Sequence, residues 1–239
     1  MRTALSRPTA AGAAALRPDR KAAILLAAEK LFAQHGYHAV SLRQIAADAG
    51  VPLALVSYYY GAKHELFHAI FEHWSPTIGQ RLALLDIALS QSERPDLREI
   101  VRAFIEPVVA LRASAEGEYY AMLVARELVY RTPDTERVLK EYFDPMANAF
   151  IDALQVALPH ATRAQLAWGY QFAVGALLHH LADTRVERLS AGQSCASDPV
   201  AWPLLVDFIA GGLHAALPMP DRAARTAASP AQESRRPTR

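Results

Sequence analysis

Apolar residues recur at helical spacing over most of this sequence, and this periodicity limits the chain to an all-α fold. Ile24, Ala27 and Leu31 follow one another at intervals of three and four residues until Gly36, where a helix would stop. No stretch alternates apolar and polar residues for long enough to be a convincing strand. The same spacing, punctuated by glycine and proline, predicts further helices at about residues 41–49, 52–60, 63–74, 77–90, 97–113, 118–130, 134–157, 162–189 and 199–216.

Three prolines are expected to interrupt this pattern. Pro76 is predicted to separate the helix that ends near Trp74 from the next one. Pro107 and Pro145 lie inside apolar-periodic stretches, which we expect to be kinked or broken there, because proline lacks the backbone N–H of a helix.

Composition excludes two broad classes of protein. Cys195 is the single cysteine among 239 residues, so an internal disulfide framework and a cysteine-based structural zinc site are excluded. We interpret it as an exposed, inert thiol. The longest apolar runs have seven residues, whereas a membrane-spanning helix needs about 20, so no membrane partner is expected.

Charge is distributed unevenly along the chain. Residues 1–63 contain eight Lys and Arg against three acidic residues, whereas residues 64–217 contain twelve against nineteen. A basic front end joined to an acidic body suggests that one part meets a polyanion, although chance variation over short windows is an alternative. Residues 1–18 are predicted to be a flexible basic arm, and residues 218–239, rich in Pro and Arg, a disordered tail.

Residues 41–60 have the proportions of a helix-turn-helix. Ser41 and Gln44 have the spacing of a capping box, which opens a short helix that closes at Gly50, and a second short helix begins near Pro52. In such a motif the second helix lies in the DNA major groove. Helical geometry places Val56 inward, and the outward positions are Leu53, Ala54, Leu55, Ser57 and Tyr58.

The segment from Arg20 to Leu66 closely resembles the DNA-binding domain of the tetracycline-repressor (TetR) family. The matching elements are Ala27-Ala28, Leu31-Phe32, Gly36-Tyr37, Ser41-Leu42-Arg43, Ile45-Ala46, Ala49-Gly50-Val51, the run Tyr58-Tyr59-Tyr60, Lys63 and Leu66. Later segments more loosely resemble ligand-binding domains of some members, including regulators that respond to lipids. The resemblance implies an N-terminal three-helix bundle at residues 19–65 and a C-terminal helical ligand-binding and dimerisation domain at residues 66–217.

The resemblance also implies a function. It predicts a cytoplasmic homodimer that binds a palindromic double-stranded DNA operator, usually as a repressor, and is released by a small-molecule effector. No enzymatic activity and no cofactor are expected. Phosphate contacts in the family come from positions that correspond here to Ser41, Arg43, Tyr58, Tyr59 and Lys63.

Base recognition would fall to Leu53, Ala54, Leu55 and Ser57, where the sequence departs from many family members. The predicted recognition helix has no Arg, Lys, Asn or Gln, so it cannot make the bidentate pairs that identify guanine or adenine. We expect contacts of the two leucines with thymine methyl groups, a contact of Ser57 with a base edge, readout of DNA shape, and minor-groove contacts from the basic arm. The alternative is that the two leucines pack in the domain's own core.

Two alternatives to a DNA-binding regulator are compatible with the sequence, a metal-dependent enzyme and a ligand-binding or interaction module. The stretch from His64 to His68 matches the H-E-x-x-H pattern of zinc enzymes, with Glu65 as the base, but no third ligand has a familiar spacing, and we expect no metal site. A helical enzyme that uses this motif is therefore the least favoured alternative. The other alternative is a ligand-binding or interaction module without specific DNA binding, because the predicted recognition helix is poor in polar residues.

Aromatic residues and methionine concentrate in the predicted ligand-binding domain and favour an apolar effector. Arg126 and Glu127 either form a buried ion pair, which we favour, or Arg126 binds the carboxylate of a ligand. One of His179 and His180 can line a cavity. The predicted pocket residues are Phe104, Tyr119, Met122, Arg126, Tyr130, Phe172 and His179.

The dimer interface is expected on the helices at 134–157 and 162–189. Small residues in the second of these helices would permit close approach of a partner helix, so that two helices from each subunit form a four-helix bundle. The predicted interface residues are Phe150, Leu154, Leu166, Tyr170, Val174 and Leu178.

Overall fold

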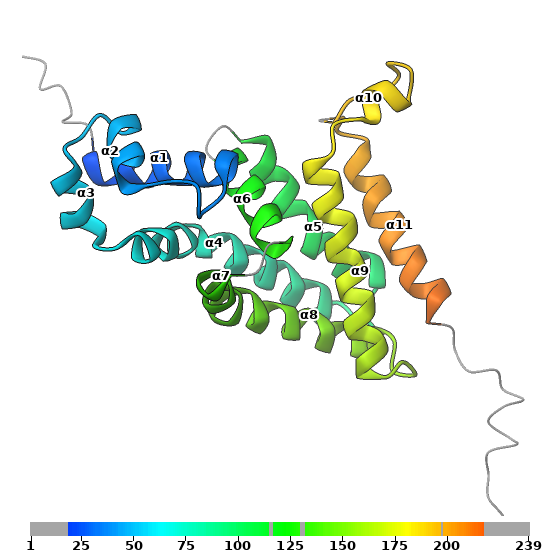
Figure 1. Ribbon diagram of the computed structural model, residues 1–239. Helices are drawn as coiled ribbons and strands as arrows, with labels where there is room; N and C mark the ends of the chain where they lie inside the picture. Colours follow the sequence, from blue (N-terminus) through cyan, green and yellow to red (C-terminus); the bar gives the residue numbers. More distant parts are fainter. Residues whose placement is uncertain (1–18, 115–116, 130–131, 197, 218–239) are drawn as a thin grey trace, which may run out of the picture.

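The computed structural model describes residues 19–114, 117–129, 132–196 and 198–217, and over these ranges the chain is helical without a strand (Figure 1). The all-α prediction is therefore confirmed. None of the helices in these ranges is long and apolar enough to cross a bilayer. The predicted arm and tail lie outside the described residues. The elements are α1 (Arg20–His35), α2 (Leu42–Asp48), α3 (Leu53–Tyr60), α4 (Lys63–Ser90), α5 (Leu97–Ala113), α6 (Glu118–Val129), α7 (Pro133–Val138), a π-helical turn (Leu139–Phe143), α8 (Asp144–Ala157), α9 (Arg163–Ala182), α10 (Val186–Leu189) and α11 (Ala201–Ala216).

The helices form two packed units that share α4. The head consists of α1 to α3 with residues 63–74 of α4, and its core includes Ile24, Ile45, Val56 and Phe67. The body consists of the remaining described residues, and its core is built mainly from α5, α8, α9 and α11. Helix α4 runs from the head into the body (Figure 1). The predicted domain boundary after residue 65 therefore falls near the start of α4, inside the head.

Local sequence signals explain most helix starts. Ser41 accepts a hydrogen bond from the backbone N–H of Gln44, and the Gln44 side chain accepts one from the N–H of Ser41, which confirms the capping box. Asp19 caps α1 through the N–H groups of Lys21 and Ala22.

The prediction that Pro76 separates two helices is wrong, because α4 is continuous from Lys63 to Ser90. Proline at this position leaves the carbonyl of Glu72 without its usual N–H donor. The Ser75 hydroxyl donates to that carbonyl at 2.8 Å, and so replaces the missing bond. Pro107 likewise lies within α5 without ending it. The expected interruption at Pro145 is confirmed, because this residue lies in the first turn of α8 directly after the π-helical turn.

Candidate nucleic-acid interface and interior cavity

Helix α3 presents most of its side chains to solvent at one end of the molecule (Figure 1). Val56 is its single buried residue and anchors it in the head core. Leu53 is 41% exposed, and Ala54, Ser57 and Tyr58 are also exposed. The alternative in which the two leucines fill the head core is therefore excluded for Leu53, whereas Leu55 is half-buried. An exposed apolar side chain on a short, rigidly held helix is available for contact with another surface.

Gly50 and Tyr60 fix the position of α3. Gly50 adopts a positive φ of 65° in the turn after α2, a conformation that glycine adopts without strain. The Tyr60 hydroxyl donates to the carbonyl oxygen of Lys21 at 2.9 Å and so ties the end of α3 to the start of α1. Burial raises the pKa of Tyr60 to about 12, which keeps this donor protonated. Tyr60 thus has a structural role in the aromatic run.

The predicted phosphate-contacting residues lie on α3 or on the elements beside it, and they differ in exposure and in the contacts that they already make. Arg43 and Tyr58 are exposed, and Tyr58 is 79% accessible. Tyr59 is less exposed, at 38%, and its ring packs edge-on against that of Tyr58. Ser41 is exposed, but its hydroxyl belongs to the capping box. The ammonium of Lys63 lies 4.4 Å from the centre of the Tyr37 ring, and partial burial lowers its pKa.

The H-E-x-x-H residues do not converge on one point. The Nε2 atom of His64 lies 3.0 Å from the carboxylate of Glu65, whereas Nε2 of His68 lies 2.8 Å from Oε2 of Glu141. Within the described part of the chain, no group of three or more His, Cys, Asp or Glu residues is arranged to hold a metal ion. Each histidine is thus paired with its own carboxylate, His64 on the surface and His68 in a half-buried position.

The body encloses a cavity of about 260 Å³ between α4, α5, α6, α8 and α9. Most of its lining is apolar, and Phe104 is the one predicted pocket residue that contributes to it. Its polar lining residues were not among the predicted pocket residues and are Thr77, Arg81, Tyr120, Asp144, Tyr170 and Gln171.

Arg81 is the most unusual of these residues. It is buried in the body, with 6% of its surface exposed, and its Nε and Nη2 atoms have no hydrogen-bond partner among the described residues. The burial of Arg81 could have been inferred from the sequence. Ile78, Leu85 and Ala88 have the helical spacing that places Arg81 with them on the apolar face of α4.

The other predicted pocket residues are located elsewhere. Met122, Arg126 and His179 line a separate open hollow of about 680 Å³ beside α6 and α9. Tyr119 packs against the head core, and Phe172 is 69% exposed. Tyr130 lies outside the described residues.

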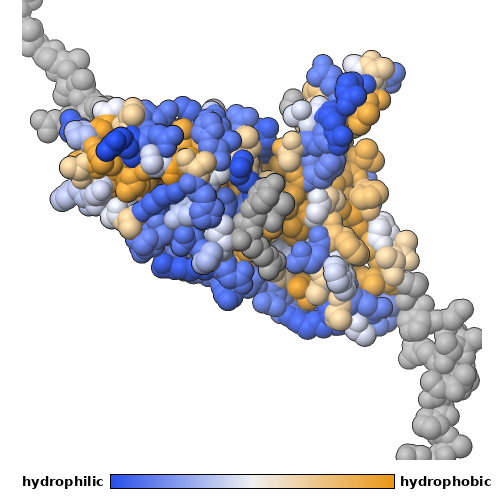
Figure 2. All heavy atoms as spheres, viewed as in Figure 1, coloured by the Kyte–Doolittle hydropathy of each residue, from blue (hydrophilic) through white to orange (hydrophobic). Residues whose placement is uncertain are grey.

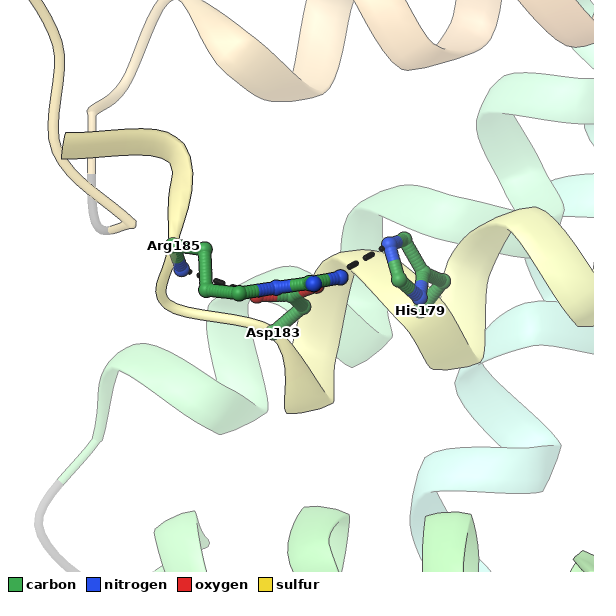
Figure 3. Close-up of polar contacts among 3 residues, drawn as sticks. All are labelled: His179, Asp183 and Arg185. Carbon is green, nitrogen blue, oxygen red and sulfur yellow. Dashed lines mark hydrogen bonds and ion pairs between the residues drawn. The ribbon is translucent and has the colours of Figure 1, made fainter. Parts of the chain in front are cut away.

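His179 is therefore a surface residue and not a lining residue of the interior cavity. Figure 3 shows His179 near the carboxylate of Asp183, which also binds Arg185. The distance from His179 Nε2 to Asp183 Oδ2 is 3.3 Å. Hydrogen bonds from Arg185 hold the pKa of Asp183 well below its usual range. His179 therefore interacts with Asp183, the residue that follows the last turn of its own helix, α9.

The favoured Arg126-Glu127 ion pair is also not formed. The Arg126 guanidinium donates to the carbonyl oxygen of His35, at the end of α1, over a distance of 3.4 Å. Glu127 is buried and accepts a hydrogen bond from the Thr135 hydroxyl at 2.7 Å. Arg126 therefore joins α6 to the head, and a cation at the end of α1 is also favourable for the helix dipole.

Four of the six predicted dimer-interface residues are buried within the chain itself and so are not available to a partner. Phe150, Leu154, Leu166 and Tyr170 are buried in the core of the body. Val174 and Leu178 line the interior cavity. Helices α9 and α11 carry four large exposed apolar side chains, Trp168, Phe172, Leu204 and Phe208, between 65% and 70% exposed. Figure 2 shows hydrophobic residues gathered over these two helices, on the right of the view.

Comparisons with known proteins agree with this architecture. Residues 24–70 match the model of bacterial regulatory proteins of the tetR family, and residues 102–212 match a tetracyclin repressor-like C-terminal domain. The chain is 27% identical to the HTH-type transcriptional regulator BetI of Brucella anthropi over 82% of this chain and 94% of that protein.

Solved structures show the same fold. The fatty acid degradation regulator FadR of Bacillus halodurans matches with a TM-score of 0.58 at 16% identity, over 83% of this chain and 98% of that one. The multidrug binding protein EbrR complexed with imidazole matches with a TM-score of 0.55 at 21% identity, over 87% and 99%. With a helix-turn-helix head, a helical body and matches to both domain models, this chain belongs to the TetR family of DNA-binding transcriptional regulators.

Proposed function

We propose that this protein is a dimeric, ligand-responsive transcriptional repressor that acts in the cytoplasm. In this proposal two heads bind a palindromic operator, and a small, largely apolar molecule in the interior cavity releases the protein from DNA. The observation that carries the proposal is the exposed outer face of α3, a helix that the head holds through the buried Val56 and through Tyr60.

The DNA contacts follow from the surroundings of α3. Leu53 and Leu55 would contact thymine methyl groups in the major groove, while Ala54 allows close approach and Ser57 contacts a base edge. Arg43, Tyr58, Tyr59 and Lys63 would contact phosphates on either side, with Ser41 beside them, although its backbone N–H and its hydroxyl both donate to Gln44 in the capping box. These contacts would place α3 in the major groove, with Arg43 and Lys63 against the phosphates beside it.

The exposed apolar residues of α9 and α11 support the dimer. Large aromatic and aliphatic side chains that gather on one face of a protein mark an interaction surface. A second copy of the chain would cover this face with the same two helices, as in a four-helix bundle on a two-fold axis. A Phe172→Asp variant should therefore sediment as a monomer, whereas Ile87→Asp, at a 54% exposed site on α4, should remain dimeric. A dimeric Phe172→Asp variant would show that the interface lies elsewhere.

Helix α4 provides the connection between cavity and head. Arg81 at the cavity lies 18 residues from Lys63, or about 27 Å at 1.5 Å per residue. A second connection runs through Tyr120, which lines the cavity and stacks on Trp74 with a ring separation of 5.3 Å. The Trp74 indole N–H in turn donates to Glu29 of α1 at 2.7 Å. A ligand that displaces α4 or Tyr120 would therefore change the position of the head, with a coupling of about 1–3 kcal/mol.

The proposal is tested by binding to a duplex from the promoter of the protein's own gene, with an unrelated duplex as the reference. We expect wild type to prefer the promoter, and Leu53→Ala to lose about tenfold in that preference, because each half-site loses apolar contacts. Leu26→Ala, at a 52% exposed site on α1, is the matched control and should bind as wild type does. Equal affinity of wild type for both duplexes would instead favour an interaction module without specific DNA binding.

A further inference from the structure

Arg81 carries a charge that the protein itself does not neutralise. Its guanidinium is buried, and no carboxylate of the described residues lies within ion-pair distance of it. Its Nε and Nη2 atoms also lack hydrogen-bond acceptors. Burying such a charge without a partner is costly, so an arginine in this state calls for an explanation from function.

Two aromatic rings account for part of its environment. The guanidinium carbon lies 4.1 Å from the centre of the Phe104 ring and 5.9 Å from that of Phe150. An aromatic face attracts a cation, but it provides no oxygen acceptor for the N–H groups. Burial lowers the pKa of Arg81 to about 10, so the group remains cationic at neutral pH.

The cavity around Arg81 is suited to a ligand with one anionic end. The hydroxyl of Tyr170 provides a further donor at the cavity, whereas the hydroxyl of Thr77, one turn before Arg81 on α4, already donates to the carbonyl oxygen of Trp74 at 2.7 Å. Burial raises the pKa of Tyr170, which keeps its hydroxyl protonated. Asp144 is the one carboxylate that lines the cavity, and it is solvent-exposed, so water screens its charge. The rest of the lining is mostly apolar.

We propose that the cavity binds a small organic acid, whose carboxylate pairs with the Arg81 guanidinium while its apolar part contacts the remaining lining. A guanidinium presents two N–H donors side by side, which match the two oxygens of a carboxylate. A carboxylate in the cavity would therefore provide Arg81 with oxygen acceptors that the described residues do not supply. This inference rests on the proposed function and specifies the chemical class of the effector.

The test uses the full chain, straight-chain monocarboxylates of increasing length together with benzoate, and the matching primary amides as neutral controls. Binding is measured by calorimetry and by the shift in melting temperature at a fixed protein concentration. We expect one or more of the acids, and none of the amides, to bind wild type. Arg81→Met should weaken acid binding about 30-fold or more, because it removes one partner of a buried charge pair.

Two further variants separate ligand binding from folding. Arg81→Lys keeps the cation but loses the paired donors, so it should bind the acid more weakly than wild type and more tightly than Arg81→Met. Asp144→Asn removes a negative charge that would repel the carboxylate of the ligand. This variant should therefore bind the acid at least as tightly as wild type does. If Arg81→Met fails to fold, Val174→Phe, which narrows the cavity and leaves Arg81 in place, should exclude the longer acids first.

The inference is overturned if no acid binds wild type, or if acids and amides bind equally well. Undiminished acid binding by a folded Arg81→Met variant also overturns it. Promoter binding is measured in the same samples, first without acid and then with it. Promoter binding without acid binding refutes the ligand class alone, whereas acid binding that leaves DNA binding unchanged refutes the proposed release mechanism and keeps the site.

Discussion

Glu29 gives the sharpest prediction about stability. Its carboxyl group lies in the contact between α1, α4 and α6, with 2% of the residue exposed. Oε2 accepts the hydrogen bond from the Trp74 indole, whereas Oε1 has no partner among the described residues. Burial raises the pKa of Glu29 from its ordinary 4.5 to about 7, and the hydrogen bond from Trp74 and the interaction with the backbone N–H of Tyr120 offset only part of this effect.

The sign of the pH dependence follows from these pKa values. Below about pH 4.5 the group is protonated in the folded and the unfolded chain, so its contribution to stability is intact. Between 4.5 and 7 the unfolded chain loses the proton while the folded chain keeps it, and the free energy of unfolding falls. The full loss above pH 7 is about 3 kcal/mol, at about 1.4 kcal/mol per pH unit.

Replacement of Glu29 by Gln removes the titration and keeps an oxygen acceptor for Trp74. We expect urea unfolding of wild type to show a decline in stability between pH 5 and 8 that Glu29→Gln lacks, with a difference of up to about 3 kcal/mol. Both proteins are measured at the same concentration, because a dimer's stability depends on it. Glu72→Gln removes an exposed carboxylate from α4 and should keep the wild-type slope. If Glu29→Gln follows the wild-type pH profile, the carboxyl group is already ionised in the folded protein and the reasoning is refuted.

Two further predictions concern the head. Tyr60→Phe removes the hydroxyl that donates to Lys21 and should lower the free energy of unfolding by about 0.5–1.5 kcal/mol in chemical denaturation, whereas Tyr58→Phe should leave it unchanged. Gly36→Ala should cost more than about 1 kcal/mol in the same assay, because Gly36 has a φ of 84° and an added Cβ would lie 2.8 Å from the Arg126 guanidinium. Gly175→Ala, in the open middle of α9, should be neutral or stabilising, and equal effects of the two glycine substitutions would contradict this account.

The head was predictable because its signals are local. The Ser41–Gln44 capping box and the turn at Gly50 depend on residues that are close in sequence. The inward position of Val56 follows from helical geometry, and the structure confirms it. Pro76 was misjudged for a local reason as well, because its usual helix-breaking effect is compensated by the hydroxyl of the preceding serine.

The body was predicted less well because its helices are apolar on more than one face. Helix α9 directs Leu166 and Tyr170 into the core, and Trp168 and Phe172 to the surface. When apolar residues surround a helix, periodicity does not show which face meets the core and which meets a partner. The role of Arg126 was equally inaccessible, because its acceptor on α1 is 91 positions away in the sequence.

Selection of binding sites from random duplex DNA by the purified full chain tests the central claim most directly. The account predicts enrichment of a two-fold symmetric sequence, with thymines in each half-site where the leucines of α3 approach the groove. Recovery of no enriched sequence, or enrichment of the same sequence to the same degree by Leu53→Ala, would contradict the assignment of α3 as the recognition helix.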